Sequence, residues 1–292
     1  MTGTHWDRYW IQGGGGCLPD ADRAFGPVLE TLWRDFGAQL PPGARVLDLA
    51  TGNGVVLRML AAGGRRLDLT GIDSAGTLPK PPPGIALRAG VAMEKLPFRD
   101  RQFDALTSQF GIEYGDTAAI AREAVRVLKP GGRFRFVVHH ADGPIVAHNR
   151  ARREAIAWAR DESGVLPRAR QLARARLGAR LPTPASFRVA VEDARARFPG
   201  QSAAAEFQAA ILQTLDMGAS RPPAETLEVL AEIERRAGEE IGRLDALAGA
   251  AQDEDGVRTI VGQLYAAGLD PDEATIVIDA GVPLAWRLDG TA

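Results

Sequence analysis

Val46-Leu47-Asp48-Leu49-Ala50-Thr51-Gly52-Asn53-Gly54 carries the strongest structural signal in the chain. Residues 45–49 predict a short buried strand, the small residues after them predict a tight turn, and residues 55–62 predict a helix. A turn without bulky side chains lets a ligand approach the backbone at the carboxyl edge of a sheet. The N-terminus of the next helix adds unpaired N–H groups there. The stretch therefore predicts a ligand site at a strand–turn–helix junction.

Strands and helices alternate on both sides of this stretch, which predicts a doubly wound α/β sheet with mostly parallel strands. The further strands are expected at 67–72, 85–89, 103–108, 132–139, 275–279 and 283–288. The further helices of this part are expected at 20–39, 117–128 and 257–267.

The pattern changes over residues 141–251, where alanine, arginine, glutamate and leucine dominate and strand signals are absent from the sequence. Helices are expected there at 145–159, 169–179, 202–215 and 224–247, separated by prolines at 167, 182, 184, 199, 222 and 223. We therefore predict one α/β domain, residues 1–140 and 252–292, whose fifth strand is followed by a helical insertion, residues 141–251.

Asp73 ends the second predicted strand, about twenty residues after the glycine turn. A carboxylate at this place can accept hydrogen bonds from both hydroxyl groups of a ribose. A solvated loop aspartate or a helix N-cap is the alternative interpretation of Asp73 alone.

Four motifs in this order resemble those of class I S-adenosylmethionine-dependent methyltransferases, in particular the ubiquinone/menaquinone-type group. They are Asp48-x-Ala50-x-Gly52-x-Gly54, Asp73, the pair Glu94-Lys95-Leu96-Pro97-Phe98 and Phe103-Asp104-Ala105-Leu106, and Leu128-Lys129-Pro130-Gly131-Gly132. A dehydrogenase would instead carry G-x-G-x-x-G, but Leu57 stands at the third glycine position. The resemblance implies a Rossmann-like sheet of seven strands, S-adenosylmethionine as cofactor and S-adenosylhomocysteine as product.

The resemblance also implies which residues bind the cofactor. The backbone around Ala50, Thr51 and Gly52 would hold its methionine part, and Asp48 and Gly54 of the same motif are also expected at the cofactor. Asp73 would bind the ribose with Ser74 beside it, and the adenine would lie near Ala92 and Met93, followed by Glu94. Ser108, Gln109 and Phe110 would face the sulfonium and the methionine carboxylate. Ala92 departs from the family, which commonly has an aspartate there for the adenine amino group; Glu94 or water is the substitute we expect.

Residues for the methyl acceptor are expected at the carboxyl ends of strands four and five. His139 and His140 end the fifth strand, and because side chains alternate along a strand, only one of them is expected to face the site as a base. Capping of the strand is the alternative role. Glu113 and Tyr114 are expected to line the pocket, and Tyr9 and Trp10 to close it or to anchor the N-terminus. No metal is expected, because these histidines with Asp142 or His148 show no established ligand spacing.

Composition narrows the class of protein. The chain has 292 residues, 45% of them hydrophobic, a formal net charge of −2 and a single cysteine, Cys17. Such values are typical of a globular protein of a reducing cytoplasm, with neither a disulfide nor an overall affinity for polyanions. The sequence contains no apolar run of transmembrane length and no signal peptide pattern.

Arginine is concentrated in one part of the insertion, with nine arginines against three acidic residues between Arg150 and Arg180. Trp158 is the only aromatic residue among them, whereas base stacking on nucleic acid would need more. We therefore expect methylation of an oxygen, nitrogen or carbon atom of a small-molecule acceptor enclosed by the helical insertion. The alternatives are a nucleic-acid or protein methyltransferase that docks through the arginines, and a cofactor-binding protein without catalysis. The sequence indicates no oligomeric state.

Overall fold

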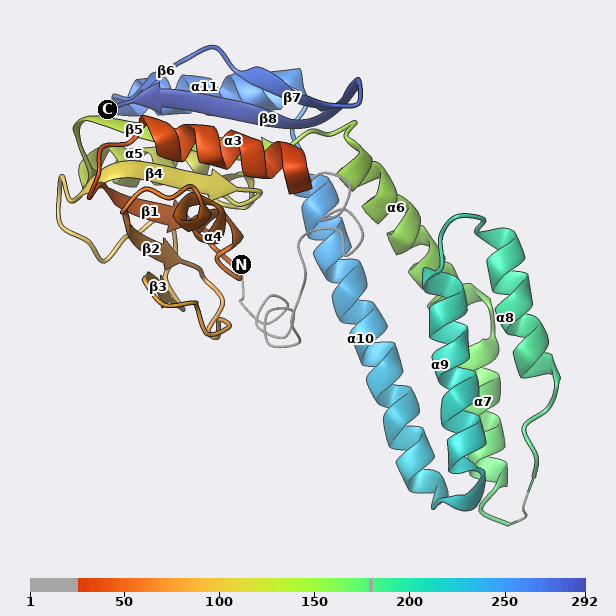
Figure 1. The fold of residues 1–292 in the computed structure, drawn as a ribbon. Coiled ribbons are helices and arrows are strands. Elements are labelled where there is room, and N and C mark those ends of the chain that lie inside the picture. The colour runs from red at the N-terminus through yellow and green to blue at the C-terminus, as the bar shows by residue number, and fades with distance from the viewer. Residues whose placement is uncertain (1–25, 179–180) are drawn as a thin grey trace. The chain divides into compact units, whose positions relative to one another are not determined.

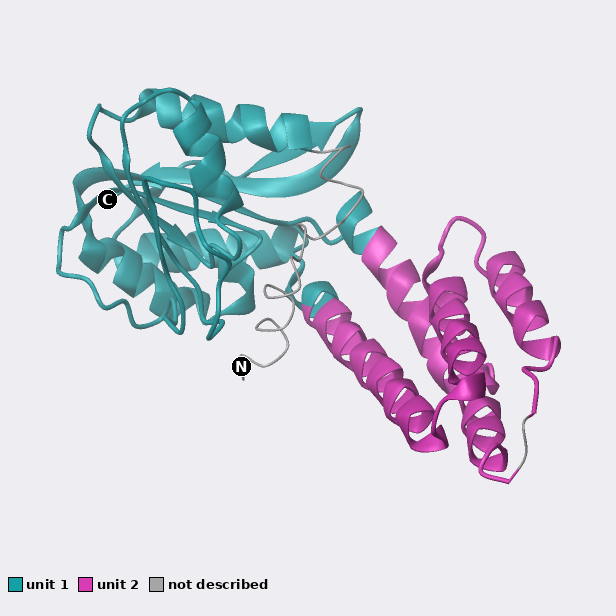
Figure 2. Ribbon diagram, turned by 60° about the horizontal axis from the view of Figure 1, so that its bottom comes forward, with its two compact units in different colours: residues 1–147, 247–292 teal, residues 148–246 magenta. Residues whose placement is uncertain are grey.

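The computed structural model describes residues 26–178 and 181–292, which divide into two compact units (Figures 1 and 2). We call residues 26–147 and 247–292 the sheet unit and residues 148–246 the helical unit. Helices α6 (Pro144–Ala157) and α10 (Pro223–Ala250) each continue from one unit into the other.

The described part of the sheet unit contains one sheet of eight strands in the order β3-β2-β1-β4-β5-β8-β6, with β7 also paired to β8. The strands are β1 (Arg45–Leu49), β2 (Asp68–Ile72), β3 (Ile85–Arg88), β4 (Phe103–Gln109), β5 (Leu128–His139), β6 (Asp270–Pro271), β7 (Thr275–Asp279) and β8 (Val282–Thr291). The pairs among β1 to β5 are all parallel, and β8 is antiparallel to its three neighbours. All seven predicted strands are confirmed, and β6 is an additional strand of two residues.

The strand order reverses between β1 and β4, because the chain adds β2 and β3 on one side of β1 and then β4 and β5 on the other. Connections leave the carboxyl ends of β1 and β4 in opposite directions at this point. Open α/β sheets bind their ligands in the crevice that such a reversal leaves. The glycine turn that follows β1 lies at this point.

Helices cover both faces of the sheet because alternate strand residues point to opposite sides. Val46 and Val137 belong to the core beneath α3 (Gly26–Gln39) and α4 (Val55–Ala62), whereas Leu47 and Val138 belong to the core beneath α5 (Thr117–Val127) and α11 (Glu254–Ala267). The described part of the helix predicted at 20–39 starts at Gly26.

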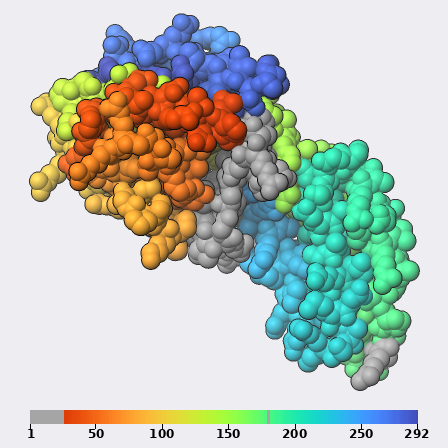
Figure 3. Space-filling model, in the orientation of Figure 1, coloured from red at the N-terminus to blue at the C-terminus, as the bar shows by residue number. Residues whose placement is uncertain are grey.

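The helical unit has a separate core. Its helices besides α6 and α10 are α7 (Val165–Ala175), α8 (Ser186–Arg197) and α9 (Ala203–Met217), and a short π-helical turn (Trp158–Glu162) follows α6. Alanine supplies much of the buried surface: Ala155, Ala159, Ala169, Ala173, Ala194 and Ala204 are fully buried. Small side chains let the helices approach closely, and α8 packs against α9. Figure 3 shows the same residues in a space-filling view.

Helix α8 is absent from the sequence prediction, which left residues 180–201 as a connection between prolines. Its buried residues Phe187, Ala190, Val191 and Ala194 follow the spacing of one helix face, but two of these four are alanines, which give a weak signal. Pro167 does not separate helices as predicted. It lies in the first turn of α7, where the absent N–H group has no intrahelical partner.

No helix among the described residues is long and apolar enough to cross a membrane.

Candidate functional site

The turn after β1 has the conformation that its small residues allow. Ala50, Gly52 and Gly54 all have positive φ angles, of 51°, 52° and 75°. The amide of Thr51 donates to the carbonyl of Ile72 over 2.8 Å, so the turn is attached to the end of the neighbouring strand β2. Gly54 then provides the left-handed residue that precedes α4. The predicted strand–turn–helix unit is therefore confirmed in its geometry.

Two glycines outside the motif let this turn pack closely against its neighbours. A Cβ atom on Gly71 of β2 would lie 2.5 Å from Oγ1 of Thr51. A Cβ atom on Gly111, just after β4, would lie 2.5 Å from Cβ of Ala50. The turn is therefore held between the ends of β2 and β4, with no room for a further side chain on either side.

Asp73 is fixed beside the turn. Its side chain is buried, with Oδ2 accepting from the amide of Gly52 over 2.9 Å and Oδ1 accepting from the amide of Ala75 over 2.9 Å. The contact with Gly52 joins the two elements that sequence analysis connected only by spacing. Ser74, next along the chain, is exposed.

Asp48 lies on β1 and is almost completely buried. Its Oδ1 accepts a hydrogen bond of 2.7 Å from the hydroxyl of Thr107 on β4. Burial, together with the nearby charge of Asp73, raises the pKa of Asp48 to about 7, although the hydrogen bond from Thr107 works in the opposite direction. A carboxyl group that changes charge near neutral pH therefore lies beside the turn.

The candidate residues at the end of β4 form hydrogen bonds with the neighbouring strand β1 and with helix α3. The hydroxyl of Ser108 donates to the carbonyl of Leu49 over 3.0 Å, and Oε1 of Gln109 accepts from Nε1 of Trp33 on α3 over 2.6 Å. Phe110 follows with a positive φ of 56°. Trp33 and Thr107 were not among the predicted site residues, because a buried tryptophan on a helix and a threonine in a strand resemble ordinary core residues.

The residues expected at the adenine lie in the segment after β3. Val91 donates its amide to the carbonyl of Asp73 over 2.8 Å, which brings this segment to the end of β2. Ala92 is exposed, Met93 is partly buried against the core, and Glu94 accepts through Oε1 from the amide of Asp116 over 3.1 Å. Recognition of the adenine amino group by Glu94 stays a prediction, with Oε2 as the oxygen that this bond does not use.

The two histidines at the end of β5 lie on opposite faces of the sheet. His139 stacks on Phe110, with ring centroids 4.2 Å apart, and its Nδ1 is 2.9 Å from Oε1 of Glu113. His140 stacks on Trp286 of the other core, with centroids 4.9 Å apart, and its Nδ1 accepts from the amide of Asp142. The structure therefore brings together His139, Glu113, Phe110 and Tyr114, and it does not bring His140 to them.

Comparisons with known proteins agree with this geometry. Residues 47–136 match the family model of a methyltransferase domain. The chain is 42% identical over 111 residues to the demethylmenaquinone methyltransferase of Corynebacterium kroppenstedtii, a match that covers 36% of this chain and 47% of that protein. Residues 47–136 form a class I S-adenosylmethionine-dependent methyltransferase domain.

Other relatives of the methyltransferase domain carry similar names. The ubiquinone/menaquinone biosynthesis C-methyltransferase UbiE of Geotalea daltonii is 36% identical over 119 residues, covering 36% of this chain and 51% of that protein. The chain thus spans about half the length of the curated relatives it matches. A solved methyltransferase of Aquifex aeolicus is 13% identical, with a TM-score of 0.45 over 94% of this chain and 93% of that chain.

The residues of the methyltransferase domain fit S-adenosylmethionine. The turn presents backbone without large side chains at Gly52 and Gly54, and the carboxylate of Asp73 is held against the turn, at the place where an acid binds ribose hydroxyls in open α/β sheets. Tyr9 and Trp10, which were expected to close the site, lie outside the described residues.

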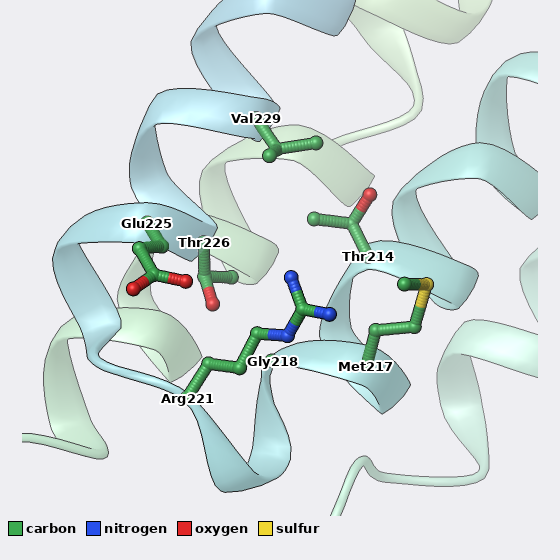
Figure 4. Close-up of a pocket in the computed structure, with 7 residues that line it drawn as sticks. All are labelled: Thr214, Met217, Gly218, Arg221, Glu225, Thr226 and Val229. Atoms are coloured by element: carbon green, nitrogen blue, oxygen red, sulfur yellow. The ribbon is translucent and has the colours of Figure 1, made fainter.

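A hollow in the helical unit does not suit a ligand of this size. It lies at the connection between α9 and α10 and is lined by Thr214, Met217, Gly218, Arg221, Glu225, Thr226 and Val229 (Figure 4). Its volume of about 80 Å³ is well below the several hundred Å³ of typical small-molecule sites. We therefore keep the candidate site at the carboxyl edge of the sheet.

Proposed function

We propose that this protein transfers the methyl group of S-adenosylmethionine to a small-molecule acceptor. The observation that carries the proposal is the hydrogen bond of 2.9 Å from the amide of Gly52 to Asp73, which joins the glycine turn to the carboxylate that we propose for the ribose. The roles of Asp48, Ala50, Thr51, Gly52, Gly54 and Asp73 toward the cofactor belong to this proposal. The match over residues 47–136 supports it independently.

For the acceptor we propose a ring carbon of a hydroquinone. The support is the names of the relatives, which describe demethylmenaquinone methylation and C-methylation in ubiquinone and menaquinone biosynthesis. The family match ends before the helical unit begins. We therefore assign the selection of the acceptor to the helical unit, which is the insertion predicted to have this role.

The pairing of arginines argues against docking of a nucleic acid on the helical unit. Arg152, Arg153 and Arg170 form ion pairs with Glu240, Asp245 and Glu234, at nitrogen–oxygen distances of 2.6, 2.8 and 2.5 Å. A cation that is already paired adds less attraction for phosphate groups than a free one. These arginines are better explained as contacts between helices of one unit.

Calorimetric titration of S-adenosylhomocysteine tests the cofactor site. We expect micromolar binding to the wild type and at least a tenfold weaker affinity, about 1.4 kcal/mol, for Asp73→Ala. Asp68→Ala is the matched control, because Asp68 begins the same strand at its opposite end and has a largely exposed side chain. Equal affinity of wild type and Asp73→Ala would contradict the proposed cofactor site.

A radiolabelled methyl-transfer assay distinguishes an enzyme from a cofactor-binding protein. It uses S-adenosylmethionine with 1,4-naphthohydroquinone, a phenol, an amine and an RNA as separate acceptors. Label in the hydroquinone product alone supports the proposed acceptor, and label in the RNA favours the alternative. Cofactor binding without any labelled product would favour the protein without catalysis.

A further inference from the structure

Glu113 and His139 form a buried pair whose two side chains are completely shielded from solvent. Oε1 of Glu113 is 2.9 Å from Nδ1 of His139 and also accepts from the backbone amide of His139 over 3.1 Å. One carboxylate oxygen thus holds both the backbone and the ring of the histidine. Because an acceptor faces Nδ1, the proton of the neutral ring is kept on Nδ1 and the lone pair on Nε2.

The local fold leaves this pair little freedom. Glu113 lies in the short 3₁₀ turn Ile112–Tyr114, which follows directly on Gly111. The ring of His139 is stacked on Phe110 at an interplanar angle of 22° and is met edge-on by Tyr114, with centroids 6.2 Å apart. Stacking and the carboxylate together determine the orientation of the imidazole.

The pair also lies close to the glycine turn that follows β1. Gly111, two residues before Glu113, packs so closely on Ala50 that a Cβ atom would be 2.5 Å from that of Ala50. His139 ends β5, which neighbours β4 in parallel, so its ring is at the carboxyl edge where the turn lies. The acid–histidine pair thus lies at the edge where open α/β sheets bind their ligands, and acid–base residues that act on a ligand are found at such sites.

We infer that Glu113 and His139 remove the proton of an ionisable O–H group on the acceptor. This inference rests on the proposed function and defines the class of acceptor as a phenol, a hydroquinone or an enol. Nε2 of His139 takes the proton, and the carboxylate of Glu113 stabilises the imidazolium that results. His139 is the catalytic residue, and Glu113 is a positioning residue that acts through it.

The electrons and the proton balance without a further reagent. The acceptor's O–H bond breaks, its proton goes to Nε2 of His139, and its electron pair stays on the oxyanion or on the conjugated ring carbon. When bound, S-adenosylmethionine supplies a methyl group that this pair attacks, while the electrons of the broken C–S bond remain on sulfur. Where a ring carbon has taken the methyl group, this carbon then loses its own proton and the ring oxygen regains one, which restores the aromatic ring. One proton in total is released, and it passes from His139 to solvent as the product leaves.

Ionisation of a bound phenol tests the inference without knowledge of the natural acceptor. The probe is 4-nitrophenol, whose phenolate has its own visible absorption band, added to the complex with S-adenosylhomocysteine at about one pH unit below the pKa of the free phenol. We expect the wild type to bind the probe as phenolate. We expect the phenolate-to-phenol ratio of the bound probe to fall about tenfold or more in His139→Gln and in Glu113→Gln.

Matched controls separate this role from a structural one. Glu113→Gln keeps the shape of the side chain and an accepting oxygen for Nδ1 of His139, but it removes the charge. A change in the ionisation of the bound probe without a change in the affinity for S-adenosylhomocysteine therefore supports the inference. His140→Gln replaces the histidine on the opposite face and should leave ionisation unchanged. A second measurement, the nitrogen chemical shifts of the His139 ring, should show the Nδ1–H form in the wild type.

Three outcomes would overturn the inference. The first is a probe that binds the wild type only as neutral phenol. The second is equal ionisation in the wild type, His139→Gln and Glu113→Gln. The third is a chain that binds S-adenosylhomocysteine but none of the probe. By contrast, a wild-type protein that does not bind S-adenosylhomocysteine would contradict the proposed function itself.

Discussion

Asp48 shows how a single residue can link the cofactor site to pH. In the unfolded chain an aspartate loses its proton near pH 4, whereas burial raises the pKa of Asp48 to about 7 in the folded protein. Between these two values the unfolded chain releases a proton that the folded protein keeps. The contribution of Asp48 to the free energy of unfolding is therefore complete below about pH 4 and is lost as the pH rises through about 7.

We predict that Asp48→Asn removes this dependence, since asparagine keeps an oxygen for the hydroxyl of Thr107 but has no charge. The free energy of unfolding of the wild type relative to Asp48→Asn should fall by an amount on the order of 4 kcal/mol between pH 4 and pH 8. Urea unfolding at a series of pH values measures this difference. Asp35→Asn, at an exposed position of α3, is the control. A difference that stays constant with pH would contradict the raised pKa.

At the scale of elements, a buried ion pair connects one helix and two strands. Arg135 of β5 donates through Nε and Nη2 to the two carboxylate oxygens of Asp289 on β8, over 2.6 and 2.9 Å. Its third nitrogen donates to the carbonyl of Leu32 on α3, and its guanidinium lies 5.0 Å from the ring centre of Phe36. The antiparallel strand β8 is thereby attached to the parallel part of the sheet by charge as well as by its backbone.

Arg135→Met is expected to lower the free energy of unfolding by roughly 3 kcal/mol, because it leaves the largely buried Asp289 with only its weaker contact to Arg287. Arg133→Met is the matched control, since Arg133 is on the same strand but exposed. Chemical unfolding of both variants measures the effect. Equal loss in the two variants would mean that the buried pair contributes nothing specific.

At the scale of the whole molecule, each unit has its own hydrophobic core. The buried residues of the sheet unit form two clusters, one on each face of the sheet, whereas the core of the helical unit is built only from residues 155–244. The candidate cofactor residues all belong to the sheet unit. The proposed cofactor binding and the proposed selection of the acceptor are therefore assigned to units with different cores.

Replacement of residues 148–246 by a glycine–serine linker should leave the sheet unit folded, because both of its clusters remain complete. We predict that this variant binds S-adenosylhomocysteine within about threefold of the full chain, under 1 kcal/mol, and that it no longer methylates the acceptor. Calorimetry and the methyl-transfer assay measure the two properties on one preparation. Methyl transfer at the rate of the full chain would contradict the role assigned to the helical unit.

The sequence by itself determined the strands of the sheet and the turn after β1. These features depend on local patterns: apolar runs of strand length, small residues between a strand and a helix, and an acid at a set distance along the chain. Helix α8 was not predicted, although its pattern is local, because alanine contributes little to a hydrophobic period.

Only the tertiary structure decided which candidate residues meet. His139 and His140 are adjacent in sequence, but strand geometry sends them to opposite cores, and the one that faces Glu113 is determined by the register of β5 against β4. The bond from Trp33 to Gln109 joins residues 76 positions apart, and the raised pKa of Asp48 depends on burial by several elements at once. Contacts between distant segments form only in the packed fold, and these contacts cause the desolvation of buried groups. Local sequence patterns therefore cannot predict them.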